Sequence, residues 1–128
     1  MPVIVQTGRC LYGLDPMQVL YKILSAAEWR DATARGVFQG SAVDLADGFI
    51  HLSAAHQLRE TAARHFAGRE GLVLVGFAAE TLENLTWEPS RGGDLFPHVY
   101  GEIPVRLATV VHPLPLAHAG HEFPPEIP

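Results

Sequence analysis

Stretches in which apolar residues alternate with polar ones or run together divide this chain into predicted elements. The apolar run at residues 19–24 predicts a first strand. Ser25 and Glu28 have the spacing of a capping box, which predicts the start of a helix. Gly36 can adopt the left-handed conformation that ends helices, so we expect the helix to end there. The segment that follows, up to Gly48, is rich in Gly and Asp and is interpreted as a loop.

Residues 49–53 alternate in the way that a half-buried strand does. Ile50 and Leu52 would lie on one face of this strand, and Phe49, His51 and Ser53 on the other. Because side chains along a strand have a period of two, His51 and Ser53 are predicted to share a face. We therefore expect the imidazole and the hydroxyl to lie one pleat apart.

The rest of the pattern predicts another helix and further strands. Apolar residues recur every four positions over residues 54–66, which predicts an amphipathic helix that Ser53 can cap. The uninterrupted apolar run at residues 72–75 predicts a central strand covered on both faces. Residues 82–88 predict a short helical turn and a strand, and residues 103–112 predict the last strand.

These elements predict a single domain with a segment outside it at each end. Residues 17–112 hold the predicted helices and strands, residues 1–16 are interpreted as an N-terminal arm, and residues 113–128 as a Pro-rich C-terminal tail. A chain of 128 residues can bury one core without disulfides or a structural metal. The expected fold is α+β, with mostly antiparallel strands around a cleft and two main helices packed outside.

Charge and composition argue against several classes of partner. The net charge of -5 at pH 7 disfavours binding to duplex nucleic acid, which requires a basic surface. Cys10 is the only cysteine, so no intrachain disulfide can form, and a reducing compartment fits. No apolar stretch approaches about 18 residues, so neither secretion nor a membrane span is signalled. We expect a cytoplasmic protein that binds no membrane.

Two histidines are candidate catalytic residues. An imidazole titrates near neutral pH, so His51 and His98 can act as an acid, a base or a ligand-orienting donor. Alternation places His98 and Tyr100 on one face. The alternative interpretation of each histidine is a buried side chain that forms hydrogen bonds for structural reasons. Ser53 is better explained as a helix cap than as a nucleophile, because the Gly-x-Ser-x-Gly pattern is absent.

Trp87 and Glu88 add a stacking surface and a carboxylate to this set, although a core Trp and a solvated Glu are the better explanation of this pair taken alone. Metal binding is not expected. The chain has seven histidines, but they do not form a His-Glu-x-x-His motif or any other typical metal-binding spacing.

Five segments together resemble the domain-of-unknown-function family DUF952. They are residues 20–23, Trp29 in the capped helix, residues 48–53, Trp87-Glu88 and residues 96–101, so the resemblance covers about residues 19–112. Many members carry His at the position of Lys22. The segment at residues 50–53 with the following helix is also similar to a segment of the RNA 2'-phosphotransferases. That similarity implies an ADP-ribosyltransferase-like fold.

The enzymes of that fold bind NAD in a cleft between two small antiparallel sheets, so the resemblance implies NAD as a candidate cofactor. Lys22 would take the position of a basic residue on the first strand, and His51 or Ser53 that of a polar residue on the second. The third position is commonly Glu, and either Glu102 or Glu88 could match it. The acidic chain disfavours an RNA substrate.

The leading hypothesis is a pocket for a small molecule, an NAD-like or other phosphorylated nucleotide, with transferase chemistry as a further step. In this hypothesis Tyr21 and Tyr100 flank an aromatic ring, and Lys22 and the helix N-terminus at Ser53 hold phosphate. His51 and His98 orient the ribose or exchange protons. The alternative is a noncatalytic module that binds a metabolite or a peptide in the same groove.

Overall fold

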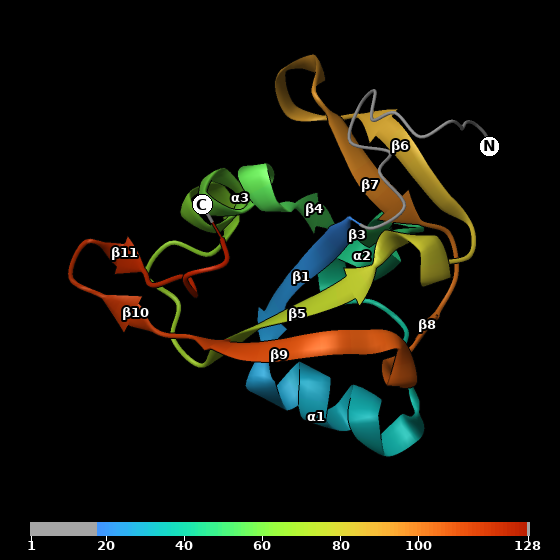
Figure 1. Ribbon diagram of the computed structural model, residues 1–128, viewed down its shortest axis with the longest axis horizontal. Helices are drawn as coiled ribbons and strands as arrows, with labels where there is room; N and C mark the ends of the chain where they lie inside the picture. Colours follow the sequence, from blue (N-terminus) through green and yellow to red (C-terminus); the bar gives the residue numbers. More distant parts are fainter. Residues whose placement is uncertain (1–17, 128) are drawn as a thin grey trace.

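Four antiparallel strands form the central sheet of the structure, a computed structural model that describes residues 18–127 (Figure 1). Their order is β4-β1-β5-β9. The strands span Val19–Ser25 (β1), Ser53–Ala54 (β4), Leu72–Ala78 (β5) and Ala108–Leu114 (β9). The apolar runs predict β1 and β5 correctly, and β5 is central, with partners on both sides. The arm predicted at residues 1–16 lies outside the described residues.

Three smaller sheets surround the central one. The three-stranded sheet has the order β3-β7-β6, and β2-β8 and β10-β11 are antiparallel pairs. Their bounds are Val37–Phe38 (β2), Ile50–His51 (β3), Leu85–Pro89 (β6), Leu95–Val99 (β7), Ile103–Pro104 (β8), Leu116–Ala117 (β10) and Gly120–His121 (β11). The β6-β7 hairpin extends away from the central sheet (Figure 1).

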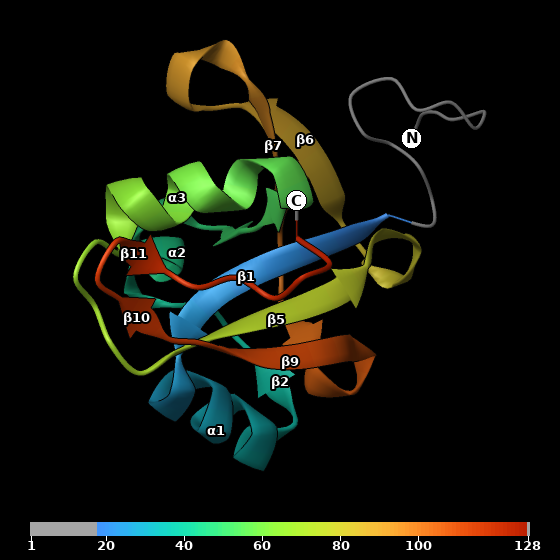
Figure 2. The same ribbon diagram turned by 60° about the vertical axis from the view of Figure 1, so that its left-hand side comes forward.

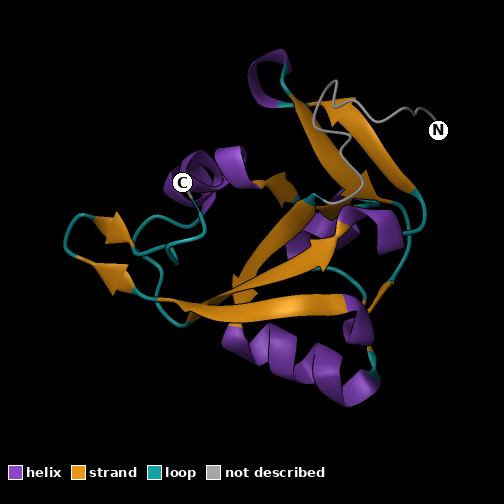
Figure 3. Cartoon of the chain, viewed as in Figure 1, coloured by secondary structure: helices purple, strands orange, loops and turns teal. Residues whose placement is uncertain are grey.

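The helices are short (Figure 3). They span Ala26–Arg35 (α1), Ala42–Asp47 (α2) and Leu58–His65 (α3), with 3-10 turns at Ala55–Gln57 (η3), Ala79–Thr81 (η4), Arg91–Gly93 (η5) and Val105–Leu107 (η6). The predicted capping box begins α1, and Gly36 ends it with φ 91°. Nowhere in residues 18–127 is there a helix long and apolar enough to cross a membrane.

Each face of the central sheet has its own hydrophobic core. On one face Leu20 and Leu24 pack with Ala32 of α1. On the other face Ile23 packs with Leu58 of α3. Because successive side chains of β1 point to opposite faces, α1 and α3 lie on opposite sides of the sheet (Figure 2). The result is a single α+β domain with antiparallel sheets and two main helices.

The segment before Gly48 is not a loop, so the sequence interpretation of it is wrong. It contains β2 and the helix α2. The Ser41 backbone N–H donates to Asp44 Oδ2 over 2.8 Å, and Gly48 closes the helix with φ 88°. A side chain three residues into the helix therefore satisfies a backbone donor at its start, which is one half of a capping box.

The single strand predicted at residues 49–53 is also wrong. Ile50 and His51 form β3 and pair with β7, whereas Ser53 and Ala54 form β4 and pair with β1. The chain changes sheets at Leu52, whose N–H donates to Pro97 O over 3.0 Å. His51 and Ser53 therefore belong to different sheets.

Ser53 does not cap a helix, which corrects a further prediction. The turn η3 precedes α3, and the Gln57 side chain accepts the Ala54 N–H over 2.9 Å. The Ser53 hydroxyl instead lies 3.2 Å from the hydroxyl of Thr61 on α3. No helix N-terminus is therefore available at Ser53 to hold a phosphate.

The end of the chain packs onto the second core. The boundary predicted at residue 112 falls inside β9, and the turn η6 interrupts the strand predicted over residues 103–112. Leu114 and Ile127 are buried with α3. Arg59 on α3 donates from Nη2 to Ile127 O over 3.1 Å. Side chains from residues 113–127, interpreted as a tail, thus complete the second core.

Candidate functional site

Asp44 on α2 is a buried carboxylate that joins three elements. Its side chain is 1% exposed and accepts hydrogen bonds from the Lys22 ammonium of β1 and from both the backbone and the ring of His51 on β3. Burial by itself would raise the pKa of Asp44, but the hydrogen bonds from His51 and Lys22 and the charge of Lys22 lower that pKa to about 2. Asp44 is therefore ionised at neutral pH and positions both partners.

The His51 ring lies between two carboxylates. Its Nδ1 is 2.6 Å from Asp44 Oδ1, and its Nε2 is 3.0 Å from Asp47 Oδ2. Carboxylate oxygens only accept hydrogen bonds, so both contacts are satisfied when the ring is protonated and donates from both nitrogens. Its side chain is 31% exposed, so a ligand can reach it.

Lys22 is buried and paired. Its Nζ lies 2.8 Å from Asp44 Oδ2 and donates to His51 O over 3.1 Å. Burial lowers the pKa of Lys22, and the carboxylates of Asp44 and Glu28 oppose that shift. The ammonium therefore holds α2 and β3 against β1.

A second carboxylate and imidazole pair lies on the neighbouring hairpin. His98 Nδ1 is 2.6 Å from Glu88 Oε1, and the Tyr100 hydroxyl donates to both oxygens of Glu88 over 2.8 and 2.9 Å. The hydrogen bond from His98 lowers the pKa of Glu88 against the effect of burial, and Tyr100 adds to this. The hydrogen bond between Tyr100 and Glu88 raises the pKa of Tyr100.

The two histidines face each other across the β3-β7 pair. His51 and His98 are direct partners in the strand register, and their ring centroids are 5.4 Å apart in an edge-on arrangement. Phe49 stacks on His98 at 4.2 Å and lies 4.7 Å from the His51 ring. Each imidazole thus has its own carboxylate on Nδ1, and Phe49 contacts both rings.

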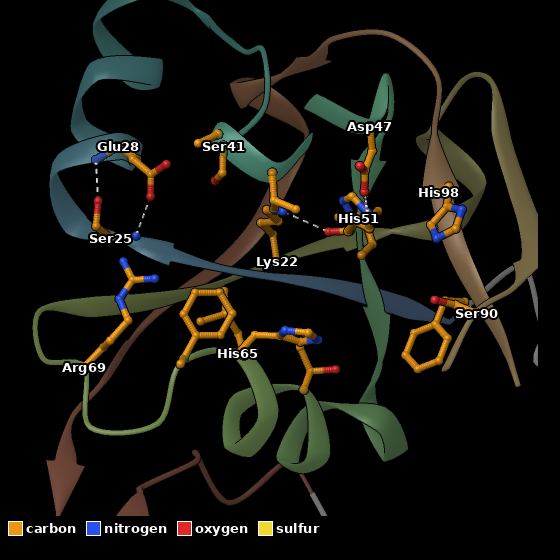
Figure 4. A pocket seen from close by; sticks show the side chains of 17 residues that line it. Lys22, Ser25, Glu28, Ser41, Asp47, His51, His65, Arg69, Ser90 and His98 are labelled. Atoms are coloured by element: carbon orange, nitrogen blue, oxygen red, sulfur yellow. Dashed lines mark hydrogen bonds and ion pairs between the residues drawn. The ribbon is translucent and has the colours of Figure 1, made fainter. Parts of the chain in front are cut away.

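The two imidazoles border a cleft of about 710 Å³. Lys22, His51 and His98 line it together with His65 and Arg69. Figure 4 shows Asp47 and His51 on one side of Lys22, and His65 and Arg69 on the other. The cleft therefore lies between β3 with α2 and the end of α3.

The structure brings together five of the eight predicted site residues: Lys22, His51, Glu88, His98 and Tyr100. Tyr100 is 41% exposed. Its hydroxyl contacts Glu88, and the centroid of its ring lies 5.3 Å from that of the Phe49 ring.

The other three predicted residues lie elsewhere. Tyr21 is buried in the second core on the opposite face of β1 from Lys22, where burial and then Glu126 raise its pKa. Ser53 pairs with Tyr21 in the central sheet. Trp87 packs against the first core, since alternation along β6 turns it away from the face of Glu88.

Sequence reasoning missed both carboxylates that contact His51, and it gave Phe49 and Arg69 no role. The sequence could have predicted the helix that carries Asp44, because the Ser41 to Asp44 spacing followed by Gly48 is typical of a short capped helix. Glu102, one of the two candidates for the third position, accepts a hydrogen bond from Gln39 over 3.1 Å. In residues 18–127 no group of three or more His, Cys, Asp or Glu side chains is arranged to hold a metal.

Comparison with known proteins adds a family but no activity. None of the curated proteins matches this chain. The crystal structure of CC0527 from Caulobacter crescentus has a TM-score of 0.77 and 55% sequence identity, covering 80% of this chain and 91% of that chain. The solution NMR structure of CC0527 has a TM-score of 0.73 at 55% identity, covering 80% and 90%. The profile of the family described as "Protein of unknown function (DUF952)" matches residues 23–112, which include Asp44, His51, His98 and Glu88. The chain therefore belongs to the DUF952 family.

Proposed function

We propose that the cleft binds a small phosphorylated nucleotide and that His51 and His98 exchange protons with it. One observation carries this proposal: two imidazoles on paired strands, each with Nδ1 at 2.6 Å from its own carboxylate, border the same cleft. A carboxylate on Nδ1 sets the ring orientation, and Nε2 is then the atom that exchanges protons; in His51 that nitrogen must first leave the exposed Asp47.

The two imidazoles suit different roles. No described residue hydrogen-bonds to Nε2 of His98, whereas Nε2 of His51 contacts Asp47 over 3.0 Å. His98 with its proton on Nδ1 can accept a proton at Nε2, so it is the base. His51 is held as a donor by two carboxylates, so it is the acid. Lys22 acts by positioning Asp44.

An NAD-like nucleotide is the finer form of this proposal, together with an ADP-ribosyltransferase-like fold and transferase chemistry. It is supported by the resemblance of residues 50–53 to the RNA 2'-phosphotransferases and by a cleft whose lining comes from both the four-stranded and the three-stranded sheet. Tyr21 and Ser53 have no part in it, because neither lines the cleft. Phe49 and Tyr100 are the aromatic rings beside the imidazoles.

Calorimetric titration with AMP, ADP and NAD, followed by NMR shift mapping, tests the binding. We expect saturable binding that perturbs signals around His51 and His98. His98→Gln should weaken binding by up to about tenfold, since it loses one hydrogen bond to the ligand. His118→Gln is the matched control, because His118 is exposed in the β10-β11 turn. Shifts scattered over the surface, or none, would refute the proposal.

A noncatalytic module is the second candidate, and one observation favours it. Both ring nitrogens of His51 and the amine of Lys22 already contact protein groups, as expected of residues that hold a groove in shape. The His51→Ala variant separates the two candidates. An enzyme would lose turnover and keep binding, whereas a module would lose binding and show no reaction in a substrate screen.

A further inference from the structure

At the histidine end of the cleft, both the Lys22 ammonium and a protonated His51 ring already contact carboxylates, so neither offers an unpaired charge to a phosphate. Lys22 is 7% exposed and its charge is balanced by Asp44. Asp47 and Glu88 add two carboxylates beside the imidazoles. A phosphate dianion placed there would meet these carboxylates at short range, which is unfavourable in a partly buried site. This end suits a neutral hydroxyl, such as a ribose hydroxyl.

Arg69 lies on the other side of the cleft, where Glu28 also lines the cavity but accepts a hydrogen bond from the Ser25 backbone N–H over 3.0 Å. Arg69 is exposed and lines the cleft in the segment after α3. Among residues 18–127 no carboxylate forms an ion pair with its guanidinium, which instead stacks over the Phe66 ring at 5.0 Å. The carbonyl of Arg69 accepts a hydrogen bond from His121 Nε2 over 2.8 Å. The backbone is thereby anchored and the side chain oriented before any ligand arrives.

We propose that Arg69 forms the phosphate subsite of this cleft. Its guanidinium would bind the phosphate or diphosphate of a nucleotide whose ribose reaches His51 and His98. The planar guanidinium suits this role, because its N–H groups can donate two parallel hydrogen bonds to phosphate oxygens. This inference rests on the proposed function and replaces Lys22 as the phosphate ligand.

The test compares ADP with adenosine as probes in calorimetric titrations of the full chain. Arg69→Gln should weaken ADP binding about tenfold or more, because it removes charge-assisted hydrogen bonds. Adenosine binding should not change. Arg69→Lys keeps the charge but loses the bidentate geometry, so it should show an intermediate loss. Arg64→Gln is the matched control, since Arg64 lies on α3 and pairs with Glu60.

Three results would overturn the inference. ADP binding to Arg69→Gln at the wild-type level would show that the phosphate lies elsewhere, while the proposed nucleotide pocket would survive. Equal losses of ADP affinity in Arg69→Gln and Arg64→Gln would mean that the arginines act only through the net charge of the protein and not through a direct contact. If the wild-type chain binds neither ADP nor adenosine, the proposed function fails as well. Melting temperatures of all the variants show whether each one is folded.

Discussion

His51 lies directly opposite His98 in the β3-β7 pair, with the two ring centroids 5.4 Å apart. The backbone pairing of two strands therefore sets the distance between the imidazoles. The carboxylates come from other elements, Asp44 from α2 and Glu88 from β6. A substitution of either carboxylate should therefore change the hydrogen bonding of one imidazole and leave the register of the β3-β7 pair in place.

Asp44→Asn should destabilise the protein strongly. The buried Lys22 would lose the carboxylate that balances its charge, and removing one partner of a buried ion pair costs about 3–5 kcal/mol. Urea denaturation measures the change. Asp47→Asn is the control, since Asp47 is 47% exposed and its loss should cost less than about 1 kcal/mol. Equal stability losses in the two variants would contradict the central role of Asp44.

The stability of the protein should fall as the pH is lowered toward the pKa of Asp44. That pKa is about 2 in the folded state and lies below the ordinary value of 3.8, so the unfolded chain takes up the proton first. The stabilisation from ionised Asp44 is fully present at a pH above the pKa of Asp44 in the unfolded chain. It is lost as the pH falls through the pKa of Asp44 in the folded protein. The expected loss is roughly 2 kcal/mol. Urea midpoints from about pH 5 downward measure it, and Asp44→Asn should show a flatter profile. A variant profile as steep as that of the wild type would contradict this assignment.

Tyr100→Phe should raise the pKa of Glu88 toward its ordinary value, because the variant removes the hydroxyl that donates to both carboxylate oxygens. The His98 contact remains, so the pKa should stay below the ordinary value. Carbon-detected NMR titration of the Glu side chains measures this change. Glu60 provides the control in the same spectra, since it pairs with Arg64 on α3. An unchanged titration of Glu88 would exclude an electrostatic role for Tyr100.

Local features of the chain were predictable where neighbouring residues decide them. The Ser25 and Glu28 capping box and the Gly36 cap need only a few adjacent residues, and α1 has the predicted ends. The apolar runs that became β1 and β5 are also local signals. The approach of His98 and Tyr100 to one carboxylate follows from alternation along a strand, although Glu88 had to come from the paired strand.

The sequence by itself determined the α+β class, the two main strands, α1 and α3, and the residues from which a site could be built. Only the tertiary structure decided that the chain changes sheets at Leu52, between His51 and Ser53. The reason is that β3 pairs with β7 and β4 pairs with β1, and both partner strands lie far away along the chain. It also brought Asp44 onto Lys22, a contact between residues 22 positions apart. A buried charge needs a partner, and no local pattern specifies which carboxylate will supply it.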